Sequence, residues 1–117
     1  MKRIILLAFL CTTTLVMAQR INHVQEAIAN YDYEAALTLI AKEKPTIPLL
    51  LQKGKAQRGL GMNTEALSTY QEIITNDTAN TRAYIEAAEC CRSLAKYQQA
   101  LKYYEQALDL NPENKYV

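Results

Sequence analysis

Very few side chains in this sequence have the type and spacing that catalysis requires. His23 is the only histidine, and no cysteine or serine is evidently paired with it. Glu86 and Glu89 lie three residues apart, a spacing at which two carboxylates can share general acid and base roles, but solvated glutamates on helix faces often have the same spacing. Gly-rich phosphate loops, GxSxG and HExxH are absent. We therefore expect a protein that is not an enzyme and holds no cofactor.

The cysteines form no recognisable metal or redox motif. Cys90 and Cys91 are adjacent, so on a helix their side chains point about 100° apart, and a bond between them would need strained geometry. No histidine or further cysteine lies near them at the spacing of metal ligands. We expect both to be small buried core residues, and we predict no metal site.

The composition fits one small globular domain. The chain has 117 residues, half of them hydrophobic, and its 13 basic and 12 acidic side chains give a formal net charge of +1. Such a balanced charge provides no field that would favour nucleic acid or a membrane surface. The length suits one domain and leaves little room for two.

The first eighteen residues have the pattern of a secretory signal peptide. Lys2 and Arg3 precede an apolar run that begins at residue 4, and the segment ends on the small residue Ala18. We expect cleavage after Ala18, so that the mature chain begins at Gln19, loses two basic side chains and carries a net charge of −1. The predicted organisation is a signal peptide over 1–18 and a repeat domain over 19–117, exported to the periplasm or cell surface of a bacterium.

Two other interpretations of this segment stay open. A transmembrane anchor needs about 20 mainly apolar residues, whereas residues 4–18 are fewer and include Thr12–Thr14. A lipoprotein would use Cys11 as the lipidated residue, but Leu10 stands before it where a small residue is needed. We expect no membrane insertion once the signal is cleaved.

The chain repeats itself at an interval of 34 residues. Two copies cover 47–80 and 81–114, and a degenerate copy covers 20–46 at an interval of 30. A further copy would start at 115–117. Residues of the same type recur at matching positions, namely Leu60 and Leu94, Ala66 and Ala100, Leu67 and Leu101, and Tyr70 and Tyr104.

Each copy is predicted to fold as two helices. Apolar residues recur every three or four positions within each half of a copy, which places them on one helix face. Candidate caps are Thr46, Asn63 and Asn80, while Gly59 and Gly61 mark a turn. The predicted helices include 22–29 and 33–42 in the first copy, and 82–94 and 97–110 in the last.

This pattern resembles that of the tetratricopeptide repeat family, whose 34-residue unit reads W-x2-L-G-x2-Y, then A-x3-F-x2-A, then P. The last copy reads Tyr84-x2-Ala87-Ala88-x2-Cys91, then Ala100-x3-Tyr104-x2-Ala107, then Pro112. Lys53 and Cys91 depart from the pattern, at a leucine position and a tyrosine position. The resemblance covers about residues 20–117 and implies an all-α fold, a right-handed superhelical solenoid of helix-turn-helix repeats.

The resemblance also implies a non-enzymatic function in protein–protein interaction. In the family, the first helices line a concave groove that binds peptides or helices of partner proteins. The groove residues expected here are Leu51, Lys55, Arg58, Ile85, Glu89 and Arg92. A partner with an apolar anchor and a carboxylate would suit them, because arginine binds carboxylates through paired hydrogen bonds. Ile85 and Glu89 stand where some family members carry the Lys and Asn that clamp chaperone C-termini, so we expect no such clamp.

The second helix of the last copy has no following neighbour in this sequence. Three explanations stay open. The sequence is a piece of a longer protein, or its end docks on another chain, including a second copy of itself, or the end simply leaves Tyr84, Tyr103, Tyr104 and Leu108 partly exposed. The alternative function is accordingly the N-terminal repeat segment of a longer exported enzyme or receptor, whose functional domain lies beyond Val117.

Overall fold

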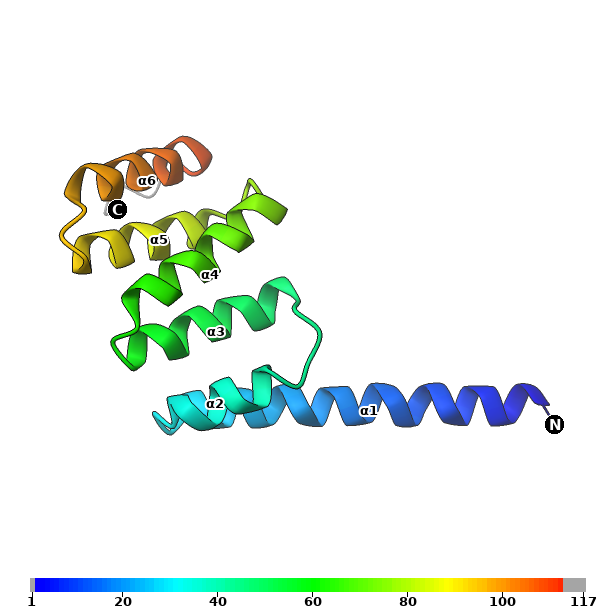
Figure 1. Cartoon of the computed structure of the whole chain (residues 1–117). Helices are drawn as coiled ribbons and strands as arrows, with labels where there is room; N and C mark the ends of the chain where they lie inside the picture. Colours follow the sequence, from blue (N-terminus) through cyan, green and yellow to red (C-terminus); the bar gives the residue numbers. More distant parts are fainter. Residues whose placement is uncertain (1, 113–117) are drawn as a thin grey trace.

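The computed structural model describes residues 2–112, without the side chains of residues 2–4, 6 and 7, and within this range it contains six α-helices and no strand. The predicted start of a further repeat at 115–117 lies outside the described residues. Each helix packs against the next along the chain, and the pairs are stacked from α1 and α2 at one end to α6 at the other (Figure 1). This arrangement confirms the predicted all-α solenoid of helical hairpins. The helices are α1 (Lys2–Ala29), α2 (Tyr33–Ile40), α3 (Ile47–Gly59), α4 (Asn63–Asn76), α5 (Thr81–Ser93) and α6 (Tyr97–Leu110).

Two of the three predicted helix caps are confirmed. The side chains of Thr46 and Asn80 accept hydrogen bonds from the backbone N–H groups three residues later, at 3.4 and 3.1 Å. The prediction for Asn63 is wrong, because Asn63 is already the first residue of α4. Met62 takes the cap position instead and makes no side-chain hydrogen bond there, because the turn closes at Gly61 and the helix starts one residue early.

The turn inside each helical hairpin has the same backbone geometry. Tyr31, Gly61 and Ala95 have positive φ angles of 60°, 75° and 59°. In each turn the N–H of this residue bonds to the carbonyl three residues earlier, and the next N–H bonds to the carbonyl five residues earlier. A left-handed residue that closes a helix in this way satisfies carbonyls that the helix leaves without partners. Glycine suits the position best, yet only one of the three turns has it.

The larger core cluster joins α3, α4, α5 and α6. Its centre is Tyr70, which is 1% exposed, and its ring lies directly on the backbone of α3 at Gly54. A Cβ added at Gly54 would lie 2.7 Å from the Tyr70 hydroxyl oxygen, so the close approach of α3 and α4 requires glycine there. The repeated positions predicted to be buried are indeed buried at Ala66, Tyr70 and Ala100.

A smaller cluster joins α1, α2 and α3. Only the last part of α1 contributes to it, through Val24 and Ile28. The predicted helix over 22–29 is therefore present but longer than expected, because no glycine or proline between residues 18 and 22 ends the helix that begins at Lys2.

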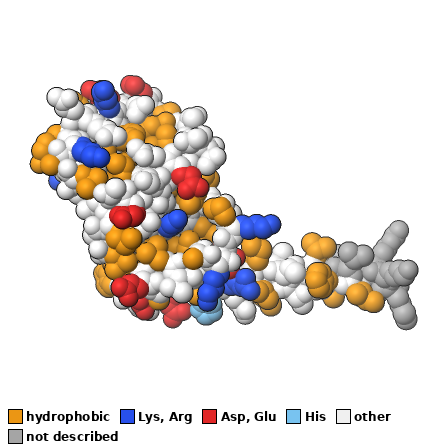
Figure 2. Space-filling view, viewed as in Figure 1, with side chains coloured by type: hydrophobic (Ala, Val, Ile, Leu, Met, Phe, Trp, Pro, Cys, Tyr) orange, Lys and Arg blue, Asp and Glu red, His pale blue; other side chains and the backbone are white. Residues whose placement is uncertain are grey.

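The first half of α1 extends away from the rest of the molecule (Figures 1 and 2). Hydrophobic side chains such as Phe9 and Leu15 are exposed along it, at 71% and 62%. No described helix is long and apolar enough to span a bilayer. The predicted cleavage after Ala18 would remove most of this exposed surface and would leave the packed part of α1 in place.

The face of α6 that points away from α5 has no helix against it among the described residues. Leu67 on α4 is 5% exposed, whereas Leu101, which lies 34 residues later, is 58% exposed. Partial exposure at this end is found for Tyr103, Tyr104 and Leu108. It is wrong for Tyr84, which is buried because its ring lies 6.4 Å from that of Tyr103 and its hydroxyl donates to the carbonyl oxygen of Thr78.

Candidate partner-binding groove

The six predicted groove residues lie on α3 and α5, the first helices of two neighbouring repeats. Lys55 and Arg92 are exposed, and the other four are half-buried. Leu51 packs against the larger core cluster, so much of its apolar surface is already used within the fold. Ile85 is the half-buried apolar side chain of this set that belongs to neither cluster. The set offers one apolar contact and several charged groups.

One ion pair joins the two helices. The guanidinium of Arg58 on α3 donates to the carboxylate of Glu86 on α5, and the two side chains are 31% and 24% exposed. This contact fixes α5 relative to α3 across the groove. Because Arg58 already has an anionic partner, it is less available to bind a carboxylate of another protein than its position in the sequence indicates.

A second charged cluster surrounds Glu89. Its carboxylate accepts hydrogen bonds from the hydroxyl of Tyr104 on α6 and from the guanidinium of Arg92, whose Nε lies 3.1 Å away. The Tyr104 hydrogen bond first, and the Arg92 hydrogen bond second, hold the pKa of Glu89 below its usual value. Glu86 and Glu89, the pair considered above as a possible acid and base, are thus each bound to an arginine.

Lys55 is the predicted groove cation without an internal partner. The described residues form four ion pairs, and none of them includes Lys55. Its side chain lines a hollow of about 360 Å³ between α1, the α1–α2 turn and α3. We name this the α1–α3 hollow, and the residues of it used below are Gln25, Ile28, Tyr31, Tyr33, Gln52 and Lys55.

The sequence prediction missed most of the α1–α3 hollow. Tyr31 was placed in a turn, and Gln25 and Gln52 were assigned no role. The signal that could have pointed to Tyr31 is its position, since the equivalent turns hold Gly61 and Ala95. An aromatic residue is unusual where the backbone is left-handed.

The two mature cysteines lie in the core, as predicted. Cys90 and Cys91 are both fully buried and neither forms a disulfide. Burial raises the pKa of Cys90 to about 11 and also raises that of Cys91. Thiols with raised pKa values in a core are poor nucleophiles, and among the described residues no group of three His, Cys, Asp or Glu side chains could hold a metal ion.

Comparison with known proteins agrees with the fold. Residues 81–114 match the tetratricopeptide repeat family. A human protein, tetratricopeptide repeat protein 6, is 30% identical over 89 residues, which is 76% of this chain but only 16% of the length of that relative. The crystal structure of PcrH in complex with the chaperone binding region of PopB matches with a TM-score of 0.77 and 19% identity, over 81% of this chain and 80% of that chain. The repeat match, the relative and the shared fold together support a tetratricopeptide repeat protein.

Proposed function

We propose that this chain is a non-enzymatic binding module that holds a segment of a partner protein in the groove lined by α1, α3 and α5. The observation that carries the proposal is the unpaired Lys55 beside a hollow on this side of the molecule. A chain of the same fold, PcrH, has been crystallised with a region of another protein, PopB. Partner binding is therefore a use to which this architecture is suited.

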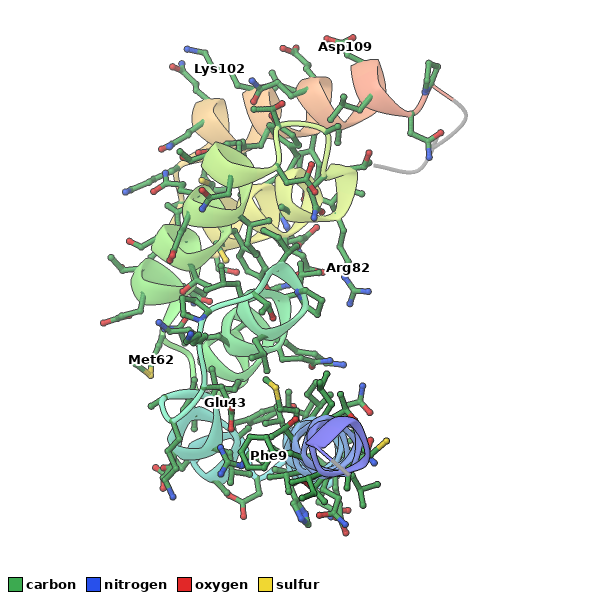
Figure 3. All side chains as sticks on the ribbon, turned by 90° about the vertical axis from the view of Figure 1, so that its right-hand side faces the viewer. Phe9, Glu43, Met62, Arg82, Lys102 and Asp109 are labelled. Atoms are coloured by element: carbon green, nitrogen blue, oxygen red, sulfur yellow. The ribbon has the colours of Figure 1, made fainter. Side chains whose placement is uncertain are left out.

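The charges of the groove favour an acidic segment. Both groove glutamates are bound to arginines of the chain itself, whereas Lys55 is unpaired. Arg82, at the start of α5, is also exposed and points into solvent (Figure 3). A partner carboxylate would gain a charge-assisted hydrogen bond without displacing an internal one.

The groove is tested by selecting peptides from a random displayed library with the full chain and measuring their dissociation constants by calorimetry. Replacing Ile85 with serine should raise the dissociation constant about tenfold. The matched control is Leu101→Ser on the outward face of α6, where the same kind of change should leave affinity within about twofold. If Leu101→Ser weakens binding and Ile85→Ser does not, the partner binds at the end of the stack and the groove proposal is wrong.

We further propose that the chain acts outside the cytoplasm after its first eighteen residues are removed. The exposed apolar part of α1 contributes nothing to either core cluster, so its loss is compatible with the fold. Expressed in a bacterium, the exported product should begin at Gln19 by mass spectrometry. Replacing Ala18 with phenylalanine should block cleavage, because the peptidase requires a small residue there. Recovery of only the uncleaved wild-type chain would refute this proposal.

A further inference from the structure

The most unusual backbone position in the molecule is Tyr31. Its φ of 60° is left-handed, a conformation that is costly for a residue with a Cβ and more so for a bulky one. Packing does not account for the choice of tyrosine, since the side chain is 79% exposed. The equivalent turns use Gly61 and Ala95, which shows that the hairpin closes without an aromatic residue. Strain combined with exposure indicates that Tyr31 contacts something outside the fold.

Tyr31 and Tyr33 together form an aromatic wall of the α1–α3 hollow. Their ring centroids are 6.3 Å apart and the rings meet edge to face at 77°. Tyr33 is held in place by α3, because a Cβ at Gly59 would lie 2.5 Å from Cδ2 of the Tyr33 ring. The ring of Tyr33 can occupy this position only because residue 59 is glycine. Ile28, which is 7% exposed, adds an apolar surface beside the wall.

The rest of the α1–α3 hollow is polar and carries a single kind of charge. Lys55 lines it, and no Asp or Glu does. The amides of Gln25 and Gln52 also line it and can donate hydrogen bonds to backbone carbonyls of an extended chain. The volume of about 360 Å³ suits a few residues of a peptide rather than a folded domain.

We propose that the α1–α3 hollow is a selectivity subsite that binds an extended segment in which a proline lies next to an acidic residue. The proline ring packs on the aromatic wall, since aromatic-lined grooves take polyproline-type segments, whose free carbonyls suit the two glutamine amides. The neighbouring carboxylate pairs with Lys55. This inference rests on the proposed function, because it identifies what the groove recognises at one end.

The chain offers a test in which loss of binding cannot be mistaken for unfolding. Tyr31→Gly removes the ring and also relieves the strained backbone, so the variant should be at least as stable as the wild type. Its dissociation constant for library-selected peptides should rise about tenfold. The matched control is Ala95→Gly, which makes the same backbone change in the turn between α5 and α6 and should leave affinity within about twofold.

The peptide sequences selected by each variant give the second readout. The wild-type chain should enrich peptides in which proline lies next to Asp or Glu, and Lys55→Glu should instead enrich peptides in which proline lies next to Lys or Arg. Enrichment of peptides without proline, or unchanged affinity in Tyr31→Gly, would overturn the subsite. If those peptides still lose affinity in Ile85→Ser, the groove itself stands. If the wild type enriches no peptide, both the subsite and the proposed function are wrong.

Discussion

The left-handed turns make a prediction about stability that is independent of function. Ala95 has φ of 59°, and a left-handed conformation costs a residue with a Cβ about 1–2 kcal/mol. Replacing Ala95 with glycine removes this cost but increases the entropy of the unfolded chain, which offsets about 0.4–1 kcal/mol. The net expectation is that Ala95→Gly raises the free energy of unfolding by roughly 0.5–1 kcal/mol.

The reverse change is available in the middle repeat. Gly61 has φ of 75°, and a Cβ added there would meet no atom within 4 Å, so Gly61→Ala introduces backbone strain without a steric clash. It should lower the free energy of unfolding by roughly 0.5–1 kcal/mol, and the double variant should lie close to the wild type because the two turns share no contacts.

Urea denaturation followed by far-ultraviolet circular dichroism measures both effects. The midpoints should move in opposite directions with the slope unchanged, since neither variant alters the surface exposed on unfolding. In thermal unfolding a change of about 1 kcal/mol corresponds to roughly 4–8 °C for a domain of this size. If Ala95→Gly instead loses about 1 kcal/mol, as an ordinary Ala→Gly change inside a helix does, the reasoning from backbone strain is refuted.

Three further predictions concern the core and the charged cluster. Gly54→Ala should lower the free energy of unfolding by about 1–3 kcal/mol in urea titrations, because the new methyl group overlaps the Tyr70 ring; an unchanged midpoint would contradict the close approach of α3 and α4. The buried thiol of Cys90 should not react with a thiol reagent at pH 8 until the chain is unfolded, and rapid labelling of the native protein would contradict its burial and raised pKa. Because Tyr104 and Arg92 lower the pKa of Glu89, its contribution to stability is present above the pKa of an unfolded glutamate and is lost as pH falls through the lower folded value; Glu89→Gln should reduce this acid-induced loss of stability between about pH 5 and pH 3, and an identical pH dependence would refute the assignment.

The repeat positions could be predicted from the sequence because they depend on spacing alone. Ala66, Tyr70 and Ala100 recur at 30 to 34 residues and lie where helices meet, so their burial follows from periodicity. Helix ends were predicted to within a few residues for the same reason. The exception is α1, where a run without glycine or proline hid the boundary between the packed helix and the extension before it.

The contacts between side chains of different repeats could not be predicted in this way. The pairing of Arg58 with Glu86 depends on the rotation between successive helical hairpins, which no spacing within one repeat specifies. The same holds for Glu89, which was expected to face the groove but is bound by Tyr104 of the following helix. The sequence therefore identified which charges lie on the first helices and left open which of them are available to a partner.

Residues that follow the repeat pattern and residues that depart from it carry different information. A position such as Tyr70 is constrained by the fold, because it fills the space between α3, α4 and α5, and any protein built from stacked repeats needs an equivalent. Tyr31 has no such explanation, since the turn it occupies forms with Gly61 or Ala95 elsewhere in the same chain. Natural sequences accept local strain mainly where it serves function. In this molecule the strained tyrosine and the unpaired Lys55 line the same hollow, which makes that hollow the place where selection for a partner is expected to act.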